Sequence, residues 1–415
     1  MTTKIRMLNI RYFMLQVLFW GAAVANYAYM TQILQYKGFS EVEIGILNGV
    51  KLVVGVAFQI WVGSYADNHV YKMPLKNIIG ILSAVSAVLT VGLFAVQHNF
   101  LLMLLISAGF GISFTTVSPL IDSLSMLYVS HGQNVNFAKG RAGGSVSWAF
   151  LCVLAGVYCD KIGIQTLPLS GAALCLLMAL AAFYMPWESI AEKNYTVKKK
   201  DSDRPHSVGY LLKNYPVYIL FLIGSALMFM GYDFGSVFMI DIFTGLGGNN
   251  IHYGLAEFVL AVSEIPSAFI ILKCRNRIPM KWLMFCCAVF MTLKNLIPTY
   301  VHDINAVILA QTCEMLGFGL FYAGGMYFIE EMLPNKDLVK ATTLISVATM
   351  GFGEGIASFI CGVIRSHLGL YGLMKTGTAV NALAVVVMLI MCCIKYDKVK
   401  VHENEQIQYM KRSYK

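Results

Sequence analysis

The segment YFMLQVLFWGAAVANYAYMTQIL occupies residues 12–34 and decides the kind of fold that this chain can adopt. A helix of about 20 apolar residues crosses the ~30 Å hydrocarbon core of a bilayer, so this segment is long enough to span a membrane. It is too long for the apolar core of a secretory signal peptide, which has about 7–15 residues. We therefore predict a first membrane-spanning helix here and no cleavable signal peptide.

Similar apolar segments recur along the whole chain. Each has about 20 residues or more, the length that a spanning helix needs. They begin near Arg11, Ser40, Leu75, Phe100, Asn136, Thr166, Leu211, Ile251, Met280, Asn305, Asp337 and Tyr371. The count predicts an all-α membrane protein with twelve transmembrane helices.

The composition supports a membrane protein and excludes a soluble one. Of the 415 residues 58% are hydrophobic and 13% are charged, whereas a soluble protein carries about 25% charged residues. A soluble interior cannot hide so much apolar surface, because buried volume grows slowly with chain length. The net charge of +9 does not indicate a nucleic-acid partner, since the Lys and Arg residues lie between apolar segments and not on one face.

One long polar connector, residues 188–206, separates the sixth predicted span from the seventh. It divides the chain into a six-helix half at residues 1–187, a linker at 188–210, a second six-helix half at 211–395 and a tail at 396–415. Two halves of this kind are typical of transporters that work by alternating access around a central site.

The basic residues predict the orientation in the membrane, because cytoplasmic loops carry an excess of Lys and Arg. With twelve spans, the basic clusters all fall on one side. They comprise Lys4, Arg6, Arg11, Lys72, Lys76, Lys139, Lys273, Arg275, Arg277, Lys281, Lys336, Lys340, Lys395, Lys398, Lys400, Lys411, Arg412 and Lys415. We expect a multi-pass protein of the plasma membrane whose termini, linker and tail are cytoplasmic.

Ionisable residues within the predicted spans mark the candidate functional site. A charge at the bilayer centre costs at least about 2.5–3.5 kcal/mol and normally faces a cavity or a partner. Acids outnumber bases in the second half, which indicates that a carboxyl group there is protonated for part of a transport cycle. The alternatives are that these charges only pin helices together, or that Lys51 extends to the outer interface. The set is Lys51, Asp122, Arg141, Asp233, Glu257, Glu264, Lys294, Glu314 and Glu354.

Several motifs resemble those of a known family. Gly63 to Asp67, GSYAD, resembles the G-x-x-x-D signature that follows helix two in the major facilitator superfamily. Residues 119–124, PLIDSL, and 140–149, GRAGGSVSWA, resemble helices four and five of the lactose permease or oligosaccharide:proton symporter group and of the 3-phenylpropionate and nucleoside permease-like group. Weaker similarity continues at residues 231–233, 291–294 and 311–314.

The resemblance implies the major facilitator fold and a role for each candidate residue. Asp122 and Arg141 would form the charged centre of the substrate site, and Trp148 would stack on a sugar ring; the alternative for Trp148 is ordinary helix packing. The family's helix-ten histidine is absent, and only one of its two helix-seven acids is matched. The remaining candidates are Asn26 and Lys51 for substrate, Asp233, Glu264, Lys294, Glu314 and Glu354 for proton coupling, and Gly63 and Asp67 for conformational change.

The function that these features favour is a proton-coupled symporter that imports a small sugar or glycoside. No nucleic-acid partner is expected. The alternatives are a carrier of the same fold for nucleosides or aromatic carboxylates, a drug exporter, and a membrane sensor or channel. A tail of about twenty residues is too short for a signalling domain. An enzyme, a metal site and a cofactor are not expected, because the histidines and the ten cysteines show no ligand spacing. We expect a monomer.

Overall fold

The computed structural model describes residues 3–68, 73–130, 132–133, 135–187, 206–275 and 277–395. Throughout these ranges the regular structure is helical, with no strand. The predicted all-α fold is thereby confirmed. The predicted tail and residues 188–205 of the predicted linker lie outside the described residues.

Helices of the first half follow the predicted apolar segments closely. Their bounds are α1 Thr3–Ala23, η1 Val24–Ala28, α2 Met30–Tyr36, α3 Glu41–Asn68, α4 Leu75–Ala95, α5 Phe100–Phe110, η2 Gly111–Thr115, α6 Thr116–Ser130, α7 Phe137–Lys161, η3 Ile164–Thr166 and α8 Leu167–Phe183. The segments η1 and η2 are single π-helical stretches inside the first and fourth spans.

Helices of the second half are interrupted more often. Their bounds are α10 Val208–Asn214, α11 Pro216–Ser236, α12 Met239–Gly245, α13 Asn250–Glu264, α14 Ser267–Cys274, α15 Met280–Tyr300, α16 Ile304–Ala310, η5 Gln311–Met315, α17 Phe318–Met332, η6 Asn335–Asp337, α18 Leu338–Ser346, η7 Val347–Gly355 and α19 Ile356–Cys393. The segment η7 is π-helical, and η5 is a 3₁₀ stretch.

Eleven helical segments among the described residues are long and apolar enough to cross a membrane. The last one, Leu338–Cys393, has 56 residues, which at 1.5 Å per residue is more than twice the ~30 Å that one crossing needs. It is interrupted at Gly369, whose φ of 70° and ψ of −177° are not helical. Division at Gly369 gives twelve spans, as predicted.

The structure corrects one predicted boundary and places a short helix across another. The first helix begins at Thr3 and not near Arg11, because a helix satisfies its own backbone hydrogen bonds and can extend past the apolar segment. Helix α10 begins at Val208 within the predicted linker, where the Ser207 side chain accepts a hydrogen bond from the Tyr210 backbone and caps its start.

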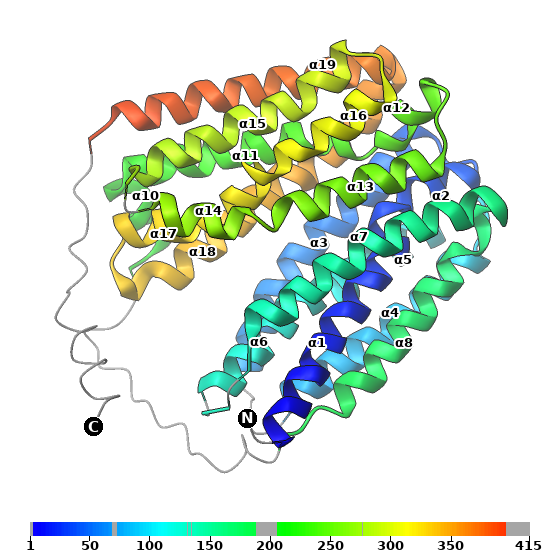
Figure 1. Cartoon of the computed structure of the whole chain (residues 1–415), viewed down its shortest axis with the longest axis horizontal. Helices are drawn as coiled ribbons and strands as arrows, with labels where there is room; N and C mark the ends of the chain where they lie inside the picture. Colours follow the sequence, from blue (N-terminus) through cyan, green and yellow to red (C-terminus); the bar gives the residue numbers. More distant parts are fainter. Residues whose placement is uncertain are drawn as a thin grey trace.

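The helices form two groups, one from each half of the chain (Figure 1). We call the end of the molecule at which α1 begins and α19 finishes the terminal end, and the opposite end the distal end. The two groups converge at the distal end, near α2 and α12, and diverge toward the terminal end (Figure 1). The precise division of the chain into halves stays a prediction.

Glycines allow the two groups to approach closely along two pairs of helices. On α3, a Cβ at Gly45 would lie 2.5 Å from the Ser358 carbonyl oxygen of α19. On α13, a Cβ at Gly254 would lie 2.5 Å from the Cys152 carbonyl oxygen of α7. Real side chains never come so close, so both helix crossings depend on glycine.

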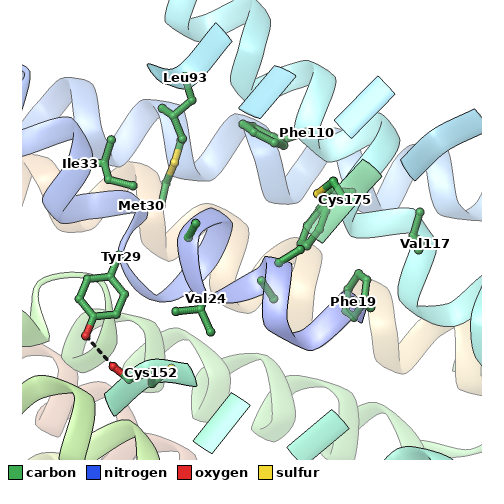
Figure 2. Packing of buried hydrophobic residues seen from close by; sticks show 14 of the residues in the cluster. Phe19, Val24, Tyr29, Met30, Ile33, Leu93, Phe110, Val117, Cys152 and Cys175 are labelled. Atoms are coloured by element: carbon green, nitrogen blue, oxygen red, sulfur yellow. Dashed lines mark hydrogen bonds between the residues drawn. The ribbon is translucent and has the colours of Figure 1, made fainter. Parts of the chain in front are cut away.

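The apolar interior of the first group continues into the distal part of the second. Figure 2 shows Phe19, Phe110 and Met30 in this cluster, all at most 1% exposed. Beside them the Tyr29 hydroxyl donates to the Cys152 carbonyl at 3.0 Å, so the buried tyrosine keeps a polar partner. This cluster therefore holds the distal ends of the two groups together.

Lysines at the terminal end cap the carbonyl ends of helices. Lys76 donates to the carbonyls of Phe183 and Met185 at the end of α8, at 3.0 and 2.7 Å. Lys281 donates to those of Cys392 and Ile394 at the end of α19, at 2.6 and 3.3 Å. The last carbonyls of a helix have no partner within it, and a cation there also interacts favourably with the helix dipole.

Candidate functional site

Asp122 lies on α6 and faces α1. Its Oδ1 accepts a hydrogen bond from Gln16 Nε2 at 2.8 Å, and the same amide nitrogen lies 3.0 Å from the Tyr12 hydroxyl. Gln16 is 1% exposed and Tyr12 is fully buried. The sequence analysis missed Gln16 and Tyr12, although Gln16 is a polar residue inside the apolar segment at residues 12–34.

Arg141 lies on α7 with its guanidinium 4.6 Å from the centre of the Trp20 ring, a stacking contact that suits its planar group. The guanidinium acts electrostatically on Asp122. Among the described side chains, however, no ion pair within 4.0 Å joins the two residues, and Arg141 Nη1 is buried without a hydrogen-bond partner. Arg141 thus acts on the oppositely charged Asp122 while its Nη1 keeps an unused hydrogen-bond donor.

Trp148 contacts both halves of the molecule. Its indole Nε1 donates to Glu257 Oε2 on α13 at 3.1 Å, and its ring meets that of Trp20 edge-on, with centroids 5.7 Å apart and an angle of 83°. The predicted platform for a sugar ring is therefore also a bridge between α7 and α13. Its role in stacking stays a prediction.

Lys294 and Glu314 form a buried ion pair in the second half. Lys294 Nζ, on α15, lies 2.6 Å from Glu314 Oε2, and the side chains are 6% and 1% exposed. The ammonium also lies 4.3 Å from the centre of the Tyr232 ring. Glu314 Oε1 has no hydrogen-bond partner, so the carboxyl group has one engaged oxygen and one free oxygen.

Glu264 lies on α13 and is influenced by charged groups of both halves. It is under the electrostatic influence of Arg141 in the first half and of Glu314 and Lys294 in the second. It is the last residue of α13, immediately before the break at Ile265–Pro266.

Lys51 is buried on α3 and does not extend to an interface. Its side chain is 5% exposed, and its Nζ lies 3.2 Å from Asn48 Oδ1, 3.4 Å from the Asn26 carbonyl and 4.8 Å from the centre of the Tyr27 ring. The Asn26 side chain is engaged elsewhere, since its Oδ1 accepts from Thr90 at 3.3 Å. Asn26 thus contacts Lys51 through its backbone.

Two carboxyl groups of the second half act on Lys51 electrostatically, those of Asp233 and Glu354. Asp233 on α11 accepts a hydrogen bond from the Ser358 hydroxyl at 2.7 Å. Glu354 lies on the π-helical segment η7, as Asn26 lies on η1. Such π-helical turns are rare and are frequent at functional sites.

The predicted conformational motif lies at the end of α3, which runs to Asn68. The surroundings of Gly63 and the side chain of Asp67 lie outside the described part of the structure. Within the part that is described, no group of three or more His, Cys, Asp or Glu side chains could hold a metal ion.

A polar cluster at the distal end was not predicted. Asp241 on α12 forms an ion pair with Arg365 Nη1 of α19 at 2.7 Å and accepts from Gln35 of α2 at 2.9 Å. Arg365 Nε lies 3.8 Å from Glu41 of α3. We call Gln35, Glu41, Asp241 and Arg365 the distal latch, because they join the two halves.

A second group of contacts lies beside the distal latch. Asn250 Nδ2 at the start of α13 donates to Asp160 of α7 at 2.6 Å, and Gln32 of α2 contacts the same amide. The Tyr253 hydroxyl donates to the Ala28 carbonyl at 2.7 Å. These residues lie at the ends of apolar segments. From the sequence alone, a polar residue there that contacts the other half cannot be distinguished from one in a solvated turn.

Comparison with known proteins gives consistent matches. The profile of the family described as "MFS_1 like family" matches residues 5–373. A curated relative, the uncharacterized transporter YwbF of Bacillus subtilis (strain 168), is 21% identical over 338 residues, 79% of each chain. A solved structure of a variant of the nucleoside transporter NupG has a TM-score of 0.80 at 15% identity, covering 92% of this chain and 99% of that one. A bacterial homolog of the human lysosomal transporter Spinster, in an inward-facing, unoccupied conformation, has a TM-score of 0.71 at 13% identity, covering 94% and 96%.

Proposed function

Because the chain belongs to the MFS_1 like family and is therefore a multi-pass membrane transporter of the major facilitator type, we propose that it is a proton-coupled symporter that imports a small sugar or glycoside. The observation that carries the proposal is the position of Glu264. Its carboxyl group is within electrostatic reach of Arg141 in one half and of the Lys294–Glu314 pair in the other. A substrate site and a proton site can thereby influence each other.

We assign the substrate site to Asp122, Arg141 and Trp148, and we add Gln16 because it donates to Asp122. A carboxylate accepts hydrogen bonds from hydroxyl groups, and a guanidinium donates them. Arg141 Nη1 is buried without an acceptor, and a buried unmade hydrogen bond costs about 1–3 kcal/mol. A substrate hydroxyl between Asp122 and Arg141 would remove that cost and would accept from one residue while donating to the other.

Proton coupling requires a carboxyl group that changes its charge state during the cycle. Glu314 is our first candidate, because it is 1% exposed and bonded to Lys294 by a single oxygen. Protonation would cancel its charge and release Lys294, which changes the field at Glu264. Asp233 and Glu354 near Lys51 are the second candidates.

Alternating access would use the two halves as moving units. In the orientation predicted from the basic residues, the terminal end is cytoplasmic and the distal end faces outward. The contacts of the distal latch and of Asn250 then close the outer side, and the divergence of the two helix groups (Figure 1) corresponds to an inward-facing state. We further propose that the protein works as a monomer in the plasma membrane.

A nucleoside is the second candidate substrate. It combines a sugar with an aromatic base, and the paired indoles of Trp20 and Trp148 lie beside Arg141, where a base could stack. The structural similarity to the nucleoside transporter NupG agrees with this alternative at the level of the fold.

The test is transport in liposomes that contain a trapped pH dye. Purified protein is reconstituted, and sugars, nucleosides and aromatic acids are added one class at a time. Acidification of the lumen when sugars are added supports the proposal. Acidification with nucleosides alone would identify nucleosides, the second candidate, as the substrate. Substrate uptake that leaves the luminal pH unchanged would rule out proton coupling.

A further inference from the structure

A small, partly open cavity lies next to the Lys294–Glu314 pair, on its distal side. Its volume is about 10 Å³, which is the space that one water molecule needs. Four polar residues line it, namely Ser236, Lys294, Asn295 and Gln311, together with apolar groups that include Met239 and Met374. A water molecule is retained inside a protein when two to four polar groups surround it.

Gln311 supplies a polar atom that needs a partner. The side chain is 1% exposed, and its Nε2 donates to the Val307 carbonyl at 3.1 Å, which fixes the amide plane. Its Oε1 is buried and accepts no hydrogen bond. Because an unsatisfied buried acceptor costs about 1–3 kcal/mol, a donor within the cavity would stabilise this arrangement.

Lys294 supplies the complementary group. An ammonium has three N–H donors, and the structure engages one of them with Glu314 Oε2. Lys294 and Gln311 both line the cavity. A water between them can accept from the ammonium and donate to Gln311 Oε1, with its second O–H directed to Ser236 or Asn295.

We propose that this cavity binds one water molecule, which acts as the second hydrogen-bond partner of Lys294 while Glu314 is protonated. When a solvent proton forms an O–H bond on a Glu314 carboxyl oxygen, the ammonium loses its anionic partner. The water keeps the buried ammonium solvated in that state, so Glu314 can be protonated without leaving a buried cation alone. Gln311 is then a positioning residue that holds the water.

This inference rests on the proposed proton coupling for its role, but the water site itself is testable without transport. X-ray radiolysis generates hydroxyl radicals from bound water, and these oxidise neighbouring methionines. Met239 and Met374 line the cavity and are 5% and 3% exposed, whereas Met284 and Met388 are fully buried elsewhere in the same half. We expect several-fold faster oxidation of the first pair, measured by mass spectrometry; equal rates in the unmodified protein would overturn the proposal.

The variant Gln311→Leu tests the positioning role. It removes the acceptor, so oxidation of Met239 and Met374 should fall to the rate of the reference methionines, and proton-driven accumulation should be lost while exchange of substrate across the membrane at equal pH persists. The matched control is Thr312→Val, because Thr312 is exposed and bonds only to the Leu309 carbonyl. If Gln311→Leu slows methionine oxidation but leaves proton-driven accumulation unchanged, the coupling role is overturned. If the protein transports none of the tested substrates, the oxidation rates alone decide whether the water site exists.

Discussion

Arg141 places a buried donor without an acceptor opposite Asp122, and this arrangement leads to the first prediction. Asp122→Asn removes the charge of the carboxylate that accepts a hydrogen bond from a substrate hydroxyl. Arg141→Lys removes the planar fork of hydrogen-bond donors. A hydrogen bond to a charged group contributes about 1.5–3 kcal/mol, so each change should weaken substrate affinity about 10- to 100-fold.

Isothermal titration calorimetry on the detergent-solubilised protein measures this affinity. Ser123→Ala is the matched control, since Ser123 is exposed on the same helix and bonds only to the Pro119 carbonyl. Unchanged affinity in both Asp122→Asn and Arg141→Lys would remove Asp122 and Arg141 from the binding site.

Glu314 leads to the second prediction, which concerns coupling and not binding. Glu314→Gln keeps an oxygen that accepts from Lys294, but it cannot exchange a proton in the physiological range. Exchange of substrate at equal pH on both sides should continue, while accumulation driven by a pH gradient should be lost. Radiolabelled substrate in proteoliposomes measures both quantities, and an undiminished accumulation ratio would exclude Glu314 from coupling.

Single residues show how much of the site the sequence contains. Lys51, Asp233, Lys294 and Glu314 stand out because a charge inside an apolar segment needs a partner, and the structure buries each of them with one. The distal latch does not stand out, because Arg365 and Asp241 lie 124 positions apart in the sequence and near the ends of their spans. Only the arrangement of the helices makes them neighbours.

At the scale of helices, the crossing of α7 and α13 gives the third prediction. A Cβ at Gly254 would lie 2.5 Å from the Cys152 carbonyl, which is backbone and cannot move aside. Overpacking of this kind costs about 1–3 kcal/mol, so Gly254→Ala should lower the melting temperature. Gly325→Ala is the control, because its Cβ would meet only Phe221, at an ordinary 3.7 Å.

A fluorogenic thiol reagent can follow this unfolding, since six of the ten free cysteines are buried and react only when the helices separate. Equal melting temperatures for Gly254→Ala and Gly325→Ala would show that an added methyl group at the crossing of α7 and α13 does not destabilise the protein.

The helices also show which local features a sequence can predict. The starts of α4, α5 and α15, at Leu75, Phe100 and Met280, coincide with the predicted ones, because the edge of an apolar segment is visible in the composition. The π-helical segments η1 and η7 and the 3₁₀ stretch η5 were not predicted. They depend on contacts with neighbouring helices, such as the approach of η7 to α3, where Gly355 meets Val53.

For the whole molecule, the distal latch gives the fourth prediction. Arg365 and Asp241 are 15% and 17% exposed and 2.7 Å apart, so Asp241→Asn should cost the closed distal end about 1–2 kcal/mol and shift the conformational equilibrium about 5- to 30-fold toward states in which that end is open. Glu41→Gln is the matched control, with a smaller expected shift, because Glu41 is 44% exposed and 3.8 Å from Arg365.

Electron-spin distance measurements between labels at Gln97 and Val301 can report the shift, since both positions are exposed on distal connections of opposite halves. The background should carry Cys393→Ser, which removes the exposed cysteine. An identical distance distribution in Asp241→Asn and the parent would show that the latch does not control closure.

The brief connections at the distal end have a consequence for how the protein meets its surroundings. Residues 96–99, 301–303 and the break at Gly369 join consecutive spans in a few residues each. A protease must draw an extended, flexible stretch of chain into its cleft, and these tight connections offer none. In the proposed orientation this face is the outward one, so the transporter would present to secreted proteases and antibodies a surface made almost entirely of helix ends, resistant to digestion and poor in linear epitopes.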